Sequence, residues 1–563
     1  MTILENLHES IKQVIKNAVE KAIANNEIDP VSEYDIQIET PREKEHGDFA
    51  TNIAMMLTKI LRKPPRTIAD AILKNMDFAN TYIAKAEVAG AGFINFFLDN
   101  SWLYDVVGVI DEQGDNYGRI NLGNGKKVMV EFVSANPTGP MHMGNARGGA
   151  LGDCLASVLD WAGYNVTREF YVNDAGNQIE KFAVSLEARY IQELKGEDAI
   201  EFPEDAYHGD DIRQHAKNFI ALYGDKYLEA EQTERRKALV DYALKLNIQA
   251  LKDDMDLYRI HFDNWFYEST LHNSNEVMET IELLKQSGYT YEKEDALWFK
   301  TTEFGLDKDD VLIRANKIPT YFAADIAYHR NKFSVRGFDK VINIWGADHH
   351  GHIARMKGAM QALGIDPDRL DIITMQLVRL MRGGEIVRMS KRTGKSITLH
   401  DLLEETNVDA ARFFFNLRQA SSHFDFDLEL AVEQSNENPV FYVQYAHARI
   451  CSIIRHLSGE GINVKNAKDI DLTALVQPQE LDLLRKLTDL TEEIKAAATT
   501  MEPSRLTRYL MDLAALFHSF YNACRVNCDD QNLMHARLKL ICCVKTVIAN
   551  VLNMLGVNAP EKM

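Results

Sequence analysis

Apolar residues follow two kinds of repeat along the first part of the chain. Between residues 2 and 25 they recur every three or four positions, as on the buried face of an amphipathic helix, at Leu4, Leu7, Ile11, Val14, Ala18 and Ala22. Another helix is predicted over residues 49–61, and residues 83–88 and 92–97 read as strands. We expect residues 1–112 to form an α+β domain.

The next segment has the pattern of a β-α-β unit. Residues 126–133 read as a buried strand, residues 144–161 as a helix with one apolar side, and residues 166–172 as a second strand. A strand, a helix and a strand in close succession are typical of a parallel crossover. We therefore predict a multidomain α/β protein with a Rossmann-like parallel sheet.

The sheet is expected to resume after a long insertion. A second α/β portion runs from about residue 310, and acidic residues crowd positions 193–211. We predict a core domain over residues 113–400 with a helical and acidic insertion near 175–295. From there to the end the pattern is helical without strand alternation, which predicts an all-α domain over residues 401–563.

Composition and charge limit the class of protein. The 563 residues are 46% hydrophobic and 26% charged, as in ordinary globular proteins. They include 63 Lys and Arg against 83 Asp and Glu, a formal net charge of −20, which argues against a nucleic-acid partner because phosphate contacts need cations. Net charge averages over all faces, and basic residues gather at 59–66 and 379–395. A nucleic-acid partner therefore stays open.

No segment suggests a membrane span, a secretory signal or a disulfide framework. No stretch approaches the roughly 18–20 apolar residues of a spanning helix, and Glu5 and Glu9 stand where a signal would need basic and then apolar residues. Six cysteines are too few for a disulfide framework in a chain of this length. Cys524, Cys528 and His535 could form part of a zinc site, but a fourth ligand is missing. We expect a cytoplasmic protein with no membrane contact and no zinc.

Two loops contain residue types that suit phosphate. Residues 134–145 lead into the start of a predicted helix, where free N–H groups favour anions; Gly144 permits close approach and His142 can donate to a phosphate oxygen. Residues 388–395 are basic, follow a hairpin turn at Gly383-Gly384, and can close over phosphates. Taken singly, the first could be only a turn before a helix and the second a solvated basic hairpin.

Together the two loops resemble the paired signatures of class I aminoacyl-tRNA synthetases. Six segments in the same order along the chain resemble arginyl-tRNA synthetases in particular: residues 46–52, Ser134–Arg147, and residues 171–177, 321–328, 345–351 and 438–449. The matches span about residues 46 to 450, and the helical remainder is in keeping with them. The resemblance implies a catalytic core between an N-terminal domain and an anticodon-binding bundle.

The resemblance also implies the reaction and its partners. The carboxylate of L-arginine would attack the α-phosphate of ATP, giving arginyl-adenylate and pyrophosphate, and the 2′-hydroxyl of the terminal adenosine of tRNA(Arg) would then take the arginyl group. Mg²⁺ is expected to enter with ATP, and activation to require bound tRNA. We expect a monomer. No editing domain is predicted, because a site that pairs buried polar groups with its substrate rejects near-isosteres strongly.

Positions that match the family's ATP site lie in both loops. The matching catalytic residues are His142, Asn145 and Lys391, and the matching ATP-binding residues are His142, Gly144, Asn145, Met389, Ser390 and Lys391. Asn145 stands where most class I enzymes have a second His, and it can donate a hydrogen bond but cannot become a cation. Arg388 and Arg392 replace the first Lys and last Ser of the usual loop signature. Because Lys391, which would steady pyrophosphate, is present, activity is expected.

Arginine needs a site that reads a planar cation with five donors. The residues that match the family's amino-acid pocket are Glu131, Ser134, Asn136, Tyr321, Asp325 and His349. Tyr321 and Asp325 lie four apart and share a face if this segment is helical. Without the resemblance, Asp325 would be an ordinary acid near a helix start. His349 with His350 and His352 could suggest a metal, but no acidic or thiol partner has matching spacing, so no protein-held metal is expected.

Candidate tRNA contacts lie in the predicted bundle and in the N-terminal domain. Tyr442, Tyr445, His447 and Arg449 offer stacking and phosphate contacts to unpaired bases, although each could instead be a core aromatic or a surface charge. The basic stretch 59–66 would touch the tRNA elbow. The rival interpretations are another class I synthetase or nucleotidyltransferase, and a non-catalytic RNA-binding paralogue.

Overall fold

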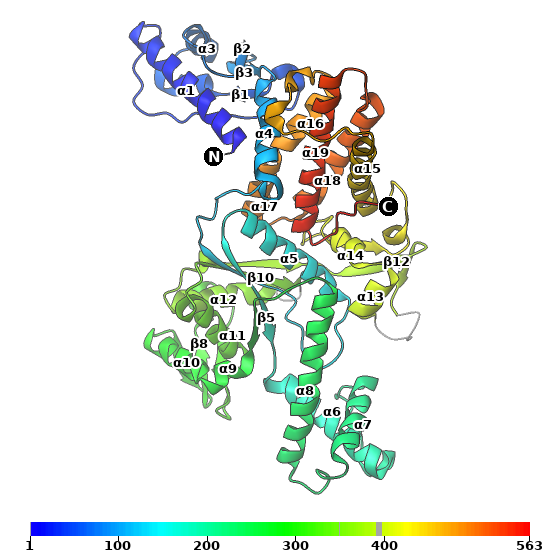
Figure 1. Cartoon of the computed structure of the whole chain (residues 1–563). Helices are drawn as coiled ribbons and strands as arrows, with labels where there is room; N and C mark the ends of the chain where they lie inside the picture. Colours follow the sequence, from blue (N-terminus) through cyan, green and yellow to red (C-terminus); the bar gives the residue numbers. More distant parts are fainter. Residues whose placement is uncertain (1, 348–349, 390–396) are drawn as a thin grey trace.

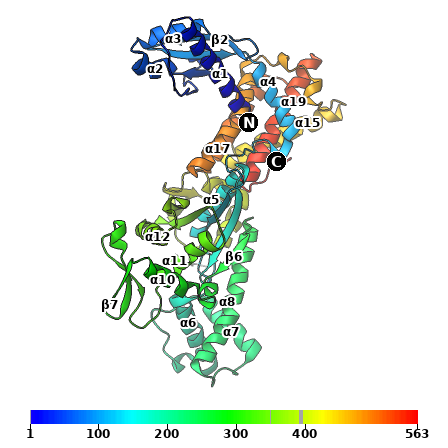
Figure 2. The ribbon, with the colours of Figure 1, turned by 90° about the vertical axis from the view of Figure 1, so that its left-hand side faces the viewer.

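The computed structural model describes residues 2–347, 350–389 and 397–563. The molecule is elongated: a small N-terminal domain lies at one end and a helical projection at the other, with a helical bundle and a parallel sheet between them (Figures 1 and 2). No helix in the described ranges is long and apolar enough to cross a membrane.

The N-terminal domain packs three helices on a three-stranded antiparallel sheet of order β1-β3-β2. Its elements are α1 (Ile3–Ala24), β1 (Phe49–Thr51), α2 (Ile53–Leu61), α3 (Pro65–Lys74), β2 (Ile83–Ala89) and β3 (Phe93–Leu98). The capping box predicted at Thr2 and Glu5 is present, and the apolar stripe of α1 is buried. The helix predicted from residue 49 is wrong for its first residues, because Phe49 to Thr51 pair with β3 instead.

The core is a five-stranded sheet, all of whose neighbouring strands run parallel, which confirms the Rossmann-like prediction. Its order is β11 (Leu370–Met375), β10 (Lys340–Gly346), β4 (Lys127–Glu131), β5 (Asn165–Val172) and β6 (Asn264–Tyr267). The crossover from β4 to β5 is α5 (Gly144–Trp161). This helix lies very close to the sheet, since a Cβ on Gly152 would come 2.2 Å from Phe132 Cγ.

Between β5 and β10 the chain leaves the sheet twice. First, α6 (Gly176–Lys195), α7 (Asp210–Tyr223) and α8 (Gln232–Leu257) form a projection (Figure 1). This projection has its own apolar cluster. After β6 come α9 (Glu268–Asn273), α10 (Glu276–Gln286), a small sheet of β7 (Thr290–Lys293), β8 (Ala296–Phe299) and β9 (Asp310–Ile313), and α11 (Tyr321–Arg330). A π-helix over Asn331–Val335 continues α11, and α12 (His350–Ala362) follows β10.

A third small sheet follows β11. It contains β12 (Val378–Arg382), β13 (Glu385–Val387) and β14 (Phe424–Asp427), and β14 runs parallel to β12. The prediction that no strand follows residue 401 is therefore wrong at β14, whose buried Phe424 and Phe426 alternate with acids over only four residues. Two short helices, α13 (Leu399–Glu405) and α14 (Val408–Phe415), lie between β13 and β14.

The C-terminal bundle contains α15 (Pro439–Gly459), α16 (Pro478–Thr488), α17 (Leu490–Thr500), α18 (Ser504–Ala523) and α19 (Gln531–Met554). One helix from the start of the chain joins it. α4 (Ser101–Gln113) packs against α16 and α19 (Figure 1). Lys539 Nζ of α19 donates to Asp111 Oδ1 of α4 at 2.7 Å. We expected α4 in the N-terminal domain; its apolar face is covered by the bundle instead.

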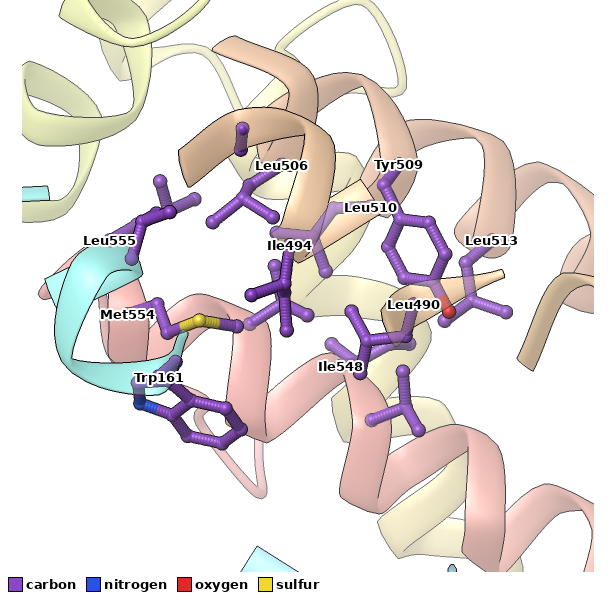
Figure 3. Close-up of a cluster of buried hydrophobic side chains, with 14 of the residues drawn as sticks. Trp161, Leu490, Ile494, Leu506, Tyr509, Leu510, Leu513, Ile548, Met554 and Leu555 are labelled. Atoms are coloured by element: carbon purple, nitrogen blue, oxygen red, sulfur yellow. The ribbon is translucent and has the colours of Figure 1, made fainter. Parts of the chain in front are cut away.

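The bundle and the sheet share one apolar core. Figure 3 shows Trp161, at the end of α5, beside side chains of α17, α18 and α19, among them Ile494, Leu506 and Met554. In the middle of α5, Asp153 binds the fully buried Arg412 of α14. The Nε of Arg412 also donates to Leu555 O at 2.7 Å. The helix that begins at the candidate phosphate loop is therefore fixed to the bundle.

Candidate functional site

The first phosphate loop ends at the start of α5. The ring of His142 accepts a hydrogen bond from the Gly144 N–H through Nδ1 at 3.0 Å, so its own proton must lie on Nε2 when the ring is neutral. Desolvation by the surrounding loop lowers the pKa of His142, which favours that neutral form. His142 is thus an uncharged donor beside a helix start. Asn145, the other predicted catalytic residue of this loop, is half-buried, and its backbone N–H donates to His142 O at 3.0 Å.

Backbone hydrogen bonds join the first phosphate loop to the segment that follows the basic loop. Met143 N–H donates to Ile397 O at 3.0 Å, and Leu399 N–H donates to Met141 O at 2.9 Å. Thr398, between these residues, forms a capping box at the start of α13. The segment that follows the basic loop, residues 397–399, is therefore fixed next to His142.

The near end of the basic loop follows β13. Met389 is 62% exposed there. Ser390 and Lys391, the other predicted residues of this loop, lie outside the described residues, and so does His349 of the predicted arginine pocket.

One wall of the predicted arginine pocket follows β4. Glu131 ends the strand, and Val133 and Ser134 have φ of 66° and 43°, a conformation that non-glycine residues rarely adopt. This turn lets Ser134 Oγ donate to Glu131 Oε1 at 3.2 Å and accept from the Tyr171 N–H at 3.2 Å. Glu131 and Ser134 are therefore in contact, while Asn136 lies exposed further along the loop.

The other wall is α11. The segment that carries Tyr321 and Asp325 is helical, which was the condition for the two residues to share a face. The Tyr321 hydroxyl accepts a hydrogen bond from the Asn177 N–H at 2.5 Å, and its ring packs on Gly176, where a Cβ would come within 2.9 Å. Asp325 Oδ2 lies 2.9 Å from His352 Nε2. A cleft of about 320 Å³ opens beside Tyr321.

The structure adds Glu268, which sequence reasoning missed, to this region. Glu268 begins α9 and lines the cleft; burial, and to a smaller extent the Asp325 carboxylate, raise its pKa. Burial also raises the pKa of Tyr171, and so do the carboxylates of Glu268, Asp325 and Glu131. Three carboxylates thus act on one tyrosine. One of them, Glu131, is already bound by the Lys332 ammonium, so Glu268 and Asp325 are the acids that suit the region to a cation. The position of Glu268 directly after β6, at the carboxyl end of a parallel strand, was the available signal.

A buried lysine lies beneath this pocket. Lys332 has no exposed surface; its ammonium binds the Glu131 carboxylate and donates to Asn343 Oδ1 at 3.1 Å. Lys332 lies in the π-helix that follows α11, and such insertions are frequent at functional sites. No local sequence pattern marks this π-helix, so sequence reasoning missed Lys332. Among the described residues, no group of three or more His, Cys, Asp or Glu is placed to hold a metal ion.

The predicted tRNA residues lie on α15, but not all face outward. Arg449 stacks its guanidinium 4.9 Å from the Tyr445 ring and 4.4 Å from the Tyr521 ring, on a half-buried surface, and Tyr442 packs against His518. The prediction for His447 is wrong in this structure. Its side chain is buried and its Nδ1 lies 2.9 Å from Pro560 O, because the C-terminal segment covers it.

Three family models match the chain. The arginyl tRNA synthetase N terminal domain matches residues 6–98, the catalytic domain of class I tRNA synthetases (R) matches residues 107–427, and the DALR anticodon binding domain matches residues 443–563. The catalytic match thus ends with β14 and includes this strand, in agreement with its pairing to β12.

Similar proteins match along the whole chain. The arginine–tRNA ligase of Ruminiclostridium cellulolyticum is 62% identical and that of Acetivibrio thermocellus 59%, each over 100% of both chains. The solved structure of Thermus thermophilus arginyl-tRNA synthetase, 21% identical, shares the fold with a TM-score of 0.73 over 98% of this chain and 100% of that one. These matches agree with the phosphate loops and the acidic pocket described above. The chain therefore belongs to the arginyl-tRNA synthetase family.

Proposed function

We propose that the chain joins L-arginine to ATP and transfers the arginyl group to the 3′-terminal adenosine of tRNA(Arg), releasing AMP and pyrophosphate. The observation that carries this proposal is the acidic pocket at the carboxyl ends of β4 and β5, beside a phosphate loop that is hydrogen-bonded to the segment following the basic loop. Such a pocket suits a guanidinium, and the loops suit a triphosphate.

The geometry supports distinct roles for the two walls and the two loops. Asp325 and Tyr321 would hold the guanidinium end of arginine, and Glu131, Ser134 and Asn136 would hold its remainder. The arginine carboxylate oxygen then forms a bond to the α-phosphorus of ATP as the bond to pyrophosphate breaks. This chemistry depends on positioning and on stabilising charge that develops on oxygen.

The loops would supply that stabilisation. Neutral His142 would donate through Nε2 to a phosphate oxygen, and Gly144 would permit close approach. Asn145, Met389 and Ser390 would complete the nucleotide site, and Lys391 would steady the departing pyrophosphate. We also propose that His349 belongs to the arginine pocket, that Mg²⁺ enters with ATP and no metal is held by the protein alone, and that the enzyme is a cytoplasmic monomer.

We place the tRNA contacts of the bundle at Tyr442, Tyr445 and Arg449. Their support is the half-buried ladder of rings and guanidinium on α15 and α18, because aromatic faces and arginine planes stack on unpaired bases. The exposed basic stretch 59–66 would contact the tRNA elbow.

The decisive experiment is pyrophosphate exchange with each amino acid in turn, with and without tRNA. We expect exchange with arginine alone, and dependence on tRNA. A response to a different amino acid would favour another class I synthetase, and no response to any would favour an RNA-binding paralogue. Lys391→Ala should slow adenylate formation strongly and leave tRNA binding nearly intact; an unchanged rate would contradict its role.

A further inference from the structure

A histidine that neither loop contains supports the predicted guanidinium contact. The side chain of His352, in the first turns of α12, is 11% exposed, and its ring lies 5.4 Å from the Trp345 ring and 5.8 Å from the Phe322 ring. Its Nε2 lies 2.9 Å from Asp325 Oδ2. The imidazole therefore packs against two aromatic rings, and its Nε2 lies within hydrogen-bond distance of the carboxylate.

The neighbouring Arg355 decides which ring nitrogen carries the proton. Its Nε–H donates to His352 Nδ1 at 2.5 Å, and its Nη1 donates to Asp310 Oδ1 at 3.2 Å. A guanidinium can only donate, so Nδ1 is an acceptor and Nε2 carries the hydrogen. His352 thus donates to Asp325 as a neutral ring. Among the described side chains, none donates to the other oxygen of this carboxylate, Oδ1.

This arrangement separates two charges that would otherwise meet. Arg355 has the same guanidinium group as the proposed substrate, and guanidinium groups pair strongly with carboxylates. If Arg355 reached Asp325, it would neutralise the carboxylate that substrate arginine needs. His352 stands between them, and Asp310 binds the other end of Arg355.

We propose that His352 is a positioning residue for arginine recognition. As a neutral spacer it orients Asp325 through Oδ2, leaves Oδ1 for the substrate guanidinium, and keeps Arg355 from competing for the site. This inference rests on the proposed function, because it takes arginine as the substrate that Asp325 binds.

Steady-state pyrophosphate exchange by the full chain with tRNA tests the proposal. H352A should raise the KM for arginine about tenfold or more, since it removes a hydrogen bond to a charged group, and should leave the KM for ATP within about twofold. H352Q should stay within about threefold of wild type, because one amide can donate to Asp325 and accept from Arg355. The double variant H352A/R355M should have a KM for arginine at least about threefold lower than that of H352A, because the competing guanidinium is gone.

A purely structural role predicts a different pattern. With a purely structural role, the KM for arginine of the double variant would be as high as that of H352A or higher. Either that result or an unchanged KM in H352A overturns the proposal. H352F keeps the ring packing and removes both hydrogen bonds, so it should show the high arginine KM even if H352A folds poorly; a normal KM there also overturns it. Failure of the proposed function is a separate outcome, because the wild-type chain would then show no exchange with arginine.

Discussion

Replacing Lys332 by Met would break the buried ion pair beneath the arginine pocket. Lys332 is completely buried and Glu131 is 7% exposed, so neither charge is hydrated by bulk water. The Lys332 ammonium binds Glu131 and donates to Asn343 Oδ1 at 3.1 Å. In the variant, Glu131 would keep the 3.2 Å hydrogen bond from Ser134 as its partner in the described structure. A charge would then remain buried with little compensation.

The expected cost follows from this burial. Removing one partner of a buried ion pair costs about 3–5 kcal/mol, so Lys332→Met and Glu131→Gln should each lower the free energy of unfolding by about that amount. The double variant removes both charges and should cost at least about 2 kcal/mol less than the sum of the two. Lys340→Met is the matched control. Lys340 pairs with Asp371 at 2.5 Å, and 41% of its side chain and 24% of the Asp371 side chain are exposed, so its loss should cost clearly less than Lys332→Met.

Urea unfolding followed by tryptophan fluorescence measures these differences. Trp265, Trp298 and Trp345 lie in this part of the chain and report on it. The reasoning is refuted if Lys332→Met costs less than about 1 kcal/mol, or if the two single effects simply add in the double variant.

Three further outcomes are expected. Gly152→Ala would place a Cβ 2.2 Å from Phe132 Cγ and should lower the stability of the fold by about 1–3 kcal/mol. In Gly108→Ala, on α4, the new Cβ would meet nothing within 4 Å, so this variant should be neutral or stabilising. The melting temperatures of the two variants check both expectations. Burial lowers the pKa of His329 well below 6.5, so the unfolded chain binds that proton more readily and stability falls as pH drops below about 6.5. When the pH is lowered from 7.5 to 5.5, the urea midpoint of the wild type should therefore fall more than that of His329→Gln. Equal decreases in the two proteins would contradict this. Tyr445→Ala should weaken tRNA binding by about 1–3 kcal/mol in a filter assay without changing the KM for arginine; unchanged binding would remove Tyr445 from the interface.

The β-α-β unit could be predicted because its signal is local. Residues 144–161 were predicted as a helix and form α5 with the same bounds, and the strands on either side agree to within a few residues. A four-residue strand such as β14 gives too short an alternation to detect, and it forms because β12 offers a free edge. The apolar face of α4 shows that the helix is covered, but not by which domain.

The candidate site divides in the same way. Residues in continuous motifs, such as His142 and Ser134, could be proposed from the sequence because each motif occupies one loop. His352 and Lys332 act through partners on other elements, so their roles depend on the tertiary structure. His447 was misplaced for the same reason, since the residue that covers it, Pro560, lies far along the chain.

The position of α4 has a consequence for synthesis on the ribosome. Its partner α16 begins roughly 360 residues later, which at about 5–20 residues per second is a delay of roughly 20–70 s. During that time the nascent chain must carry an uncovered apolar helix face: Trp102, Leu103, Val106, Val107 and Ile110. The N-terminal domain can fold early, but the apolar face of α4 cannot be covered until the bundle is made. The growing chain therefore offers chaperones a binding segment that disappears only when the last helices emerge.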